Sequence, residues 1–472
     1  MRAKAGESEV ASAAGPGLAD AFDLACVDLA LCDPSYTIHA RSCLISPRRP
    51  VSAGANFTQN APLVQCRFRG PVMMTFSSLL RPRLMTTWIS RQGLARWGVG
   101  AVLGVLLGTA SAGKPYSYFV TGDADAQVAA LKPSSTSSVV LMGGGPDVDE
   151  AFRWMIARAG IKPGTGGRFV VLRATGTEAY DPYIYYSDAA LTTSTSVAEQ
   201  WVGGASLGLS SVETLVIPSV AAANDAFVNS VVSKANAVFI AGGDQSDYIN
   251  FWKGTRLDQT LQGLMAANVP VGGTSAGLAV LGQVDFAALR GSVTTTQALA
   301  DPFNKYMTLD PSPLSPTGGF LAPPALASTI LDAHLDSRDR MGRLITFVAR
   351  LVAVNSNTGC PGGILASGTS STAARGIGVD VETALLVQGN KGPHGFTARR
   401  VTNPSTTTES AVYFVRPLIS PTVCASGAPL TLTNIEIKKL ADSETIFNLS
   451  DWTGLPSYFV DAISGALTSS PY

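Results

Sequence analysis

A serine near the middle of the chain lies between small residues, in the pattern Gly273-Thr-Ser-Ala-Gly277. It follows the apolar segment 269–273 and precedes a short helical pattern, a strand-to-helix turn at which serines act as nucleophiles. Such a turn lifts the Ser275 hydroxyl above the edge of a sheet, where the backbone N–H of Ala276 can face an oxyanion. The same residues also suit a serine that only caps the helix. The motif alone therefore predicts either a nucleophile or a helix cap.

A hydroxyl nucleophile needs a base, and the chain has three histidines, His39, His334 and His394. His39 lies in a Pro-, Ser- and Arg-rich leader, and His394 lies in a turn between two β-like segments. His334 follows the apolar segment 325–331, which predicts a strand end on the ligand-binding side of a sheet. By elimination, His334 is the candidate general base.

Three arginines, Arg338, Arg340 and Arg343, follow this histidine where a helix is expected to begin. Exposed charges on a helix surface would be the ordinary explanation. However, only 14% of the residues in this chain are charged, so a local cluster is unexpected. Guanidinium groups bind carboxylates through two parallel hydrogen bonds. The cluster therefore favours recognition of substrate carboxylates beside the candidate base.

The elements that must position these residues alternate regularly from residue 113 onwards. Strands are expected at 168–173, 212–218, 237–241 and 269–273, and in 137–145, which ends in a glycine turn. Helices are expected at 147–160, 221–235 and 246–267. Apolar strands that alternate with amphipathic helices predict a doubly wound α/β fold with a mostly parallel sheet. The residues from about 391 to 472 alternate like β-strands and predict a small β-rich C-terminal extension.

Composition narrows the possible partners. The chain has 472 residues, of which 46% are hydrophobic, and this is enough for a large core. Lys and Arg together number 34, as do Asp and Glu, so there is no basic excess for neutralising the phosphates of a nucleic acid. The glycine turn at 143–145 lacks the spacing of a dinucleotide-binding loop, and no cofactor is expected.

One uncharged apolar run, at 97–112, follows two arginines and ends in Ala110-Ser-Ala112. This is the layout of a secretory signal peptide, and it becomes normal if translation starts at Met85. We therefore expect a misassigned or disordered leader at 1–84, a signal at 85–112, and a secreted, extracellular or periplasmic product. The alternative is an uncleaved membrane anchor, for which the run is short.

Six cysteines fall into two groups. Four lie in the leader at spacings that match no familiar zinc site, so no metal is expected. Cys360 and Cys424 are the pair that remains, and an even pair in a secreted chain predicts one disulfide. Two separate buried thiols are the alternative.

Three motifs in order carry a specific resemblance: Gly242-Gly-Asp-Gln245, Gly273-Thr-Ser-Ala-Gly277, and 332–344 with its histidine and arginines. Together they resemble the cyanophycinase family of dipeptidase E-like serine peptidases, over about residues 113–390. The resemblance implies a flavodoxin-like scaffold related to class I glutamine amidotransferases. It also implies cleavage of cyanophycin, a poly-aspartate backbone that carries arginine, to β-Asp-Arg dipeptides.

The resemblance assigns Ser275 as the nucleophile and His334 as its base. It implies an oxyanion hole formed by the amides of Gly243, Ala276 and Asp244. Further motif positions imply a substrate pocket, and these positions are Gln245, Asp332, Arg338, Arg340 and Arg343.

The family pattern is altered around its acidic residue and its histidine. The acidic residue is shifted by one position, to Glu382, and Ala333 and Leu335 flank the histidine where the family commonly has Gln and Phe. The third member of a triad therefore stays open between Glu382, as first choice, and Asp380 or Asp285. We expect a secreted serine peptidase that acts on a peptide or poly-aspartate substrate, with a homodimer as the candidate assembly. An aspartyl or isoaspartyl dipeptidase and a non-catalytic binding homologue are the alternatives.

Overall fold

The computed structural model describes residues 113–186, 201–316, 318–392, 395–404, 406 and 409–472. The predicted leader, the predicted signal segment, His39 and His394 lie outside the described residues. Within the described ranges, no helix combines the length and the apolar character needed to span a membrane.

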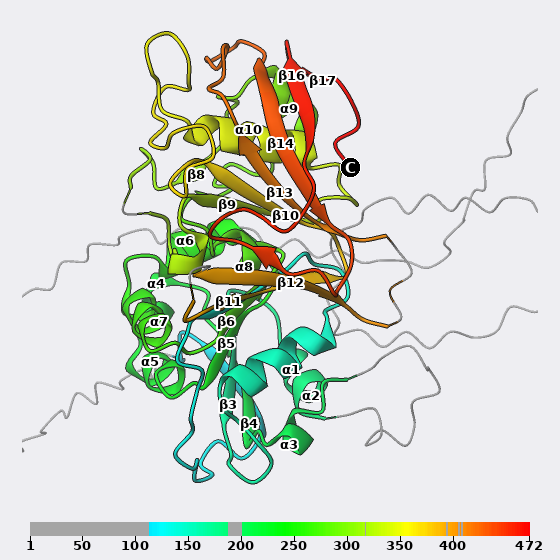
Figure 1. Ribbon diagram of the computed structural model, residues 1–472. Coiled ribbons are helices and arrows are strands. Elements are labelled where there is room, and N and C mark those ends of the chain that lie inside the picture. Colours follow the sequence, from blue (N-terminus) through cyan, green and yellow to red (C-terminus); the bar gives the residue numbers. More distant parts are fainter. Residues whose placement is uncertain (1–112, 187–200, 317, 393–394, 405, 407–408) are drawn as a thin grey trace, which may run out of the picture. The chain divides into compact units, whose positions relative to one another are not determined.

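Nine strands form the larger sheet, in the order β1-β4-β3-β5-β6-β2-β11-β12-β15 (Figure 1). Five parallel strands make up its centre: β4 (Ser211–Val216), β3 (Arg168–Arg173), β5 (Ala237–Ile240), β6 (Val271–Thr274) and β2 (Ser138–Met142). Antiparallel strands extend it on both sides: β1 (Ser117–Gly122), β11 (Thr383–Gly389), β12 (Phe396–Thr402) and β15 (Phe447–Asn448). The α/β class with a parallel sheet centre is thereby confirmed.

Helices cover both faces of this sheet (Figure 1). On one face, α1 (Asp149–Arg158) shares a core with Val140 and Met142 of β2. On the opposite face, the core contains Val139 and Leu141 together with residues of three further helices. These helices are α5 (Ala226–Val232), α6 (Gln245–Trp252) and α7 (Arg256–Ala266). Since neighbouring residues of a strand point to opposite faces, the continuous apolar sequence of β2 serves both layers.

A second sheet has six strands in the order β17-β16-β14-β13-β10-β9. They are β9 (Thr329–Ala333), β10 (Arg375–Val379), β13 (Val412–Pro417), β14 (Leu432–Leu440), β16 (Tyr458–Ile463) and β17 (Ala466–Leu467). β9 and β10 are parallel, and the other neighbours are antiparallel. The strands after residue 391 divide between the two sheets, because β12 and β15 join the larger one.

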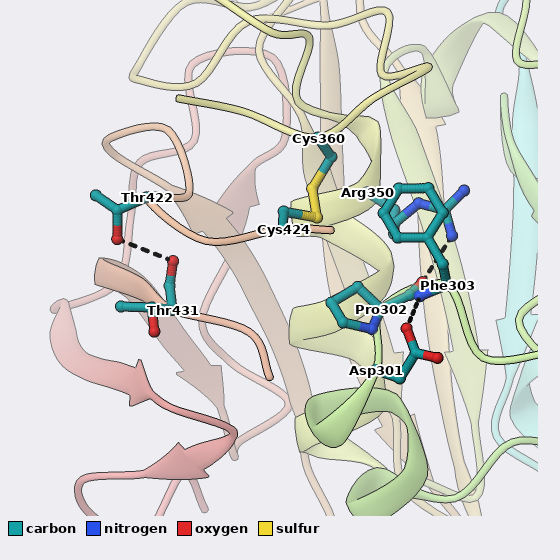
Figure 2. The surroundings of a disulfide bond; sticks show 8 residues. All are labelled: Asp301, Pro302, Phe303, Arg350, Cys360, Thr422, Cys424 and Thr431. Carbon is teal, nitrogen blue, oxygen red and sulfur yellow. Dashed lines mark hydrogen bonds between the residues drawn. A yellow bond between two sulfur atoms is a disulfide. The ribbon is translucent and has the colours of Figure 1, made fainter. Parts of the chain in front are cut away.

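The core of the second sheet is closed by two helices and a disulfide. α9 (Thr295–Ala300) and α10 (Met341–Leu351) share a buried cluster with residues of β9, β13 and β14. Cys360 and Cys424, both buried in this cluster, form a disulfide between segments 64 residues apart (Figure 2). The remaining elements are α2 (Tyr180–Tyr185), α3 (Gly204–Leu207), α4 (Val220–Ala223), α8 (Ala276–Ala279), η2 (Pro324–Leu326), β7 (Asp285–Phe286) and β8 (Leu309–Asp310).

Two helices that the sequence predicts as continuous are each broken into two. The expected helix 221–235 divides into α4 and α5 because the Asp225 carboxylate caps α5, accepting hydrogen bonds from the N–H groups of Phe227 and Val228. The expected helix 246–267 divides into α6 and α7 at extended Lys253 and left-handed Gly254. In both cases a capping or turn residue ends the helix, although the helical spacing of apolar residues continues beyond it in the sequence.

Candidate active site

Ser275 occupies a sharp turn between β6 and α8, with φ 52° and ψ −111°. The small neighbours are required by space: a Cβ on Gly273 would lie 2.3 Å from the carbonyl oxygen of Gly277. A Cβ on Gly277 would lie 2.1 Å from the carbonyl oxygen of Ile240 in the neighbouring strand. The positive φ of a serine is an uncommon backbone conformation, which packing on both sides must hold in place. The turn therefore has the geometry of a nucleophile elbow.

His334 lies directly after β9 and also has a positive φ, of 51°. Its Nε2 is 2.7 Å from Ser275 Oγ, within hydrogen-bond distance. Its backbone N–H donates to the carbonyl of Gly143 at 2.8 Å, which fixes the residue against the end of β2. A Cβ on Gly144 would lie 2.3 Å from the imidazole Cε1, so the glycine turn leaves room for the ring. The structure thus brings the predicted nucleophile and base together.

The surroundings of His334 keep its imidazole neutral. Burial is the main cause that lowers its pKa to about 4, and the positive charges of Arg338 and Arg340 lower it further. Asp332 and Asp336 oppose the shift without overcoming it. A neutral imidazole can accept the serine proton through Nε2, so the ring is in the protonation state that a general base needs at neutral pH.

None of the three candidate triad acids forms a hydrogen bond to His334 within the described residues. The Glu382 backbone N–H donates to the carbonyl of Gly144, and its carboxylate makes no hydrogen bond to the imidazole. The carboxylate of Asp380 accepts from the Ala411 N–H, and burial raises its pKa to about 7. The geometry in the structure is therefore that of a serine–histidine dyad.

Asp285, the third candidate, lies in β7 and makes its hydrogen bonds to other residues. Its fully buried carboxylate accepts hydrogen bonds from the backbone N–H groups of Gly282 and Phe320. Burial raises the pKa of this carboxyl group well above its usual value. These contacts hold two loops together, and they account for Asp285 without a catalytic role.

A cavity of about 210 Å³ opens beside Ser275. It collects the predicted oxyanion and substrate residues on one surface: Gly243, Asp244, Gln245, Ser275, Ala276, Asp332, Arg338, Arg340 and Arg343. Ala279, Ala288, Gly291, Ser292 and Ala333 complete the lining. Within the described ranges, no group of three or more His, Cys, Asp or Glu residues could hold a metal ion.

The predicted oxyanion donors lie at the ends of two neighbouring strands. Gly243 follows β5, and Ala276 follows the nucleophile at the start of α8. Asp244 caps α6, with its side chain accepting a hydrogen bond from the Ser246 N–H. Residues from both strand ends line the cavity, and backbone N–H groups there would suit the negative charge of a tetrahedral intermediate.

Two of the predicted substrate-binding residues form an ion pair with each other. Arg343 and Asp332 form a bidentate pair, with Nε to Oδ2 at 2.7 Å and Nη2 to Oδ1 at 2.6 Å. Arg343 Nη1 also donates to Ser292 Oγ and to the Val293 carbonyl. Arg343 is only 2% exposed and Asp332 3%. This pair therefore stabilises the cavity wall, and the expected role of both residues in binding substrate stays a prediction.

Arg338 and Arg340 are better placed to receive a carboxylate. Arg340 donates to the Ala333 carbonyl at 2.8 Å, and burial lowers its pKa to about 10, so it remains a cation at neutral pH. Arg338 is exposed and makes no hydrogen bond or ion pair to any described residue. Gln245 lies on the same cavity and donates through Nε2 to the Phe286 carbonyl. Both guanidinium groups line the cavity, and of the two Arg338 is the one without a protein partner among the described residues.

Tyr472 is a site residue that sequence reasoning missed. Its hydroxyl oxygen accepts from the Met341 N–H at the start of α10, at 3.1 Å. The same hydroxyl lies 3.1 Å from the Leu335 carbonyl and 3.1 Å from Asp339 Oδ1, to either of which it can donate. These contacts fasten both ends of the segment that follows His334 and carries the two available arginines. More than a hundred residues separate the contacts in sequence, so no local pattern signals them.

One protein family and several solved structures are similar to parts of this chain. Residues 199–297, which include the glycine turn at 242–243 and Ser275, match Peptidase family S51. A peptidase from an acI-B1 Actinobacterium is a similar solved structure, with 16% identity, a TM-score of 0.35, and coverage of 62% of this chain and 96% of that chain. The structure of a putative Peptidase E protein from Listeria monocytogenes EGD-e is also similar, with 14% identity and a TM-score of 0.30. The match covers 57% of this chain and 100% of that chain. No curated protein sequence matches the chain.

Proposed function

We propose that this protein is a secreted serine peptidase that resembles cyanophycinase and hydrolyses an aspartyl or β-aspartyl-arginine polymer to β-Asp-Arg dipeptides. The observation that carries the proposal is the 2.7 Å contact between Ser275 Oγ and His334 Nε2 at a strained turn. The match of residues 199–297 to Peptidase family S51 supports the same reaction class.

In the proposed reaction, Ser275 Oγ attacks the peptide carbonyl while its proton moves to His334 Nε2. The Gly243 and Ala276 amides stabilise the oxyanion of the tetrahedral intermediate. His334 then gives the proton to the leaving amine, and an ester forms between the substrate and Ser275. Water attacks this acyl-enzyme with the histidine again acting as the base, and the acid product is released with the serine restored.

Substrate selection is proposed to rest on charge. Arg338 and Arg340 lie on the cavity that contains the nucleophile, and Arg338 makes no hydrogen bond or ion pair to a described residue. A guanidinium at this position favours a substrate with a free carboxylate close to the scissile bond. Asp332 does not compete strongly for Arg340, since the two groups are 3.8 Å apart and Asp332 is already paired with Arg343.

An aspartyl or isoaspartyl dipeptidase is the second candidate, and the size of the cavity favours it. A space of about 210 Å³ accommodates only a small ligand. The two candidates differ in whether the substrate continues beyond this cavity.

Product analysis separates the candidates. The purified protein is incubated with insoluble cyanophycin and, separately, with aspartyl and isoaspartyl dipeptides, and the products are identified by mass spectrometry. We expect β-Asp-Arg from the polymer. Cleavage of dipeptides alone would support the second candidate, and cleavage of neither would contradict the proposal.

The variant Ser275→Ala tests the assigned nucleophile in the same assay, with Ser337→Ala as the matched control. Ser337 is exposed and makes no hydrogen bond to a described residue. We expect loss of hydrolysis in the first variant and full activity in the second. Secretion is tested separately by the N-terminal sequence of the protein recovered outside the cytoplasm, which should begin after residue 112.

A further inference from the structure

A second cavity, of about 500 Å³, lies beside the first and has a positively charged lining. Three cationic side chains line it, Arg290, Lys305 and Arg350, and none of its described lining residues is acidic. Apolar surface is supplied by Leu289, Phe303, Met307, Leu309 and Leu314. In a chain with only 14% charged residues, three cations around one hollow are a notable concentration. The cavity is thus suited to an anionic ligand that also has apolar parts.

Arg350 belongs to this lining, and its side chain lies against Phe303 and Pro302 (Figure 2). Its guanidinium lies 3.8 Å from the centre of the Phe303 ring, and Nη1 donates to the Pro302 carbonyl at 2.6 Å. Burial lowers its pKa to about 10, so it stays charged at neutral pH. Stacking and hydrogen bonding together hold the cation at the cavity in a defined orientation.

The carboxylates closest in sequence to this lining have other partners. Asp301 Oδ1 accepts hydrogen bonds from the N–H groups of Phe303 and Gly427. Asp310 pairs with Lys253 at 2.5 Å. Arg290 makes no hydrogen bond or ion pair to any described residue, and Lys305 lies 4.8 Å from the Tyr306 ring. The charges of the exposed cations in this cavity are therefore not neutralised by direct pairing.

One turn separates the second cavity from the first. Ala288, Gly291 and Ser292 line the cavity that contains Ser275, while Leu289 and Arg290 line the second cavity. The turn is closed by a hydrogen bond from the Gly291 N–H to the Ala288 carbonyl. The two cavities therefore adjoin at the turn formed by residues 288–292.

We propose that the second cavity binds further carboxylates of an extended acidic substrate whose scissile bond lies at Ser275. This inference rests on the proposed peptidase function and deepens it, because it names a chain of several acidic units as the preferred substrate. Arg290 and Lys305 pair with carboxylates beyond the catalytic cavity, and the apolar walls contact the intervening methylene groups. The substrate chain crosses the turn at 288–291. A dipeptide is too short to reach these cations and gains nothing from them.

Binding to a protein without the nucleophile tests the second cavity independently of catalysis. The Ser275→Ala protein is titrated with fluorescently labelled di-aspartate, hexa-aspartate and hexa-asparagine, and dissociation constants are measured by anisotropy. We expect the hexa-aspartate to bind about two- to thirty-fold more tightly than the di-aspartate, from two exposed charge pairs. Hexa-asparagine, which has the same length without the charges, should show no such gain.

Paired variants assign the gain to the cavity rather than to overall charge. Arg290→Ala with Lys305→Ala, both added to Ser275→Ala, should abolish the preference for the hexamer. The control pair, Lys234→Ala with Arg256→Ala, removes the same net charge from exposed residues that line neither cavity. This control should keep the preference for the hexamer. The preference should also decrease with added salt. Equal loss in both pairs, or no preference in the first place, would overturn the inference.

The catalytic protein distinguishes failure of this inference from failure of the proposed function. If wild type hydrolyses aspartyl peptides of every length with equal kcat/KM, the peptidase proposal stands and the second cavity plays no part. If wild type hydrolyses neither cyanophycin nor any aspartyl peptide, the peptidase proposal fails, and with it the inference about a substrate, whatever the anisotropy shows.

Discussion

The buried pair of Arg343 and Asp332 gives a prediction that separates structural from ligand-binding arginines. Arg343→Met keeps most of the side-chain volume but removes the cation and leaves the Asp332 carboxylate, only 3% exposed, without its bidentate partner. Two hydrogen bonds to a charged group contribute about 1.5–3 kcal/mol each. Breaking a buried ion pair by removing one partner costs about 3–5 kcal/mol. We therefore expect the free energy of unfolding to fall by about 3–5 kcal/mol.

Denaturant unfolding followed by fluorescence measures this loss, with Arg338→Met as the matched control. Arg338 is exposed and makes no ion pair to a described residue, so its replacement should change stability by less than about 0.5 kcal/mol. The same control should raise KM for acidic peptides. Adding Asp332→Leu to Arg343→Met should recover part of the lost stability, because no buried charge then remains. A stable Arg343→Met protein with a raised KM would refute the structural role of the pair.

Three further predictions concern the nucleophile and its base. The lowered pKa of His334 keeps the imidazole neutral, so kcat/KM should stay constant as the pH falls from 7 to 5 and reach half of its maximum near pH 4. A histidine with an unshifted pKa would reach half of the maximal kcat/KM at pH 6.5, and a midpoint there would contradict the burial of the ring. Gly277→Ala would place a Cβ 2.1 Å from a strand carbonyl, and we expect activity to fall about 100-fold through displacement of the turn, measured as kcat/KM on folded protein. Tyr472→Phe removes the hydroxyl that fastens the segment after His334, and kcat/KM should fall about three- to ten-fold with little change in the unfolding midpoint; unchanged kinetics would leave the tyrosine without a positioning role.

The sequence predicts the sheet centre well because the signal there is local. The strand expected at 168–173 coincides with β3, and the strand expected at 237–241 coincides with β5 to within a residue. Parallel strands buried on both faces are short apolar runs, which are recognisable without knowledge of their neighbours. The helix breaks at Asp225 and Gly254 are missed because a cap can interrupt an apolar period without changing it.

At the site, the sequence predicts which residues gather but not what each one contacts. The elbow has a local signature in its glycines, and His334 follows by elimination. The pairing of Arg343 with Asp332 requires a helix and a strand to meet. The contact of Gly144 with the imidazole requires two strand ends to meet. Such tertiary contacts determine whether an arginine binds a ligand or stabilises the wall of the cavity. The spacing of residues within one segment does not predict them.

Covalent labelling of the nucleophile tests the central claim most directly. The purified protein is treated with a fluorophosphonate that reacts with activated serines, digested, and mapped by mass spectrometry. We predict a single adduct on Ser275 in the wild type and a strongly reduced adduct in His334→Ala, because the hydroxyl is activated by the imidazole 2.7 Å away. An unlabelled Ser275, or equal labelling with and without His334, would contradict the account.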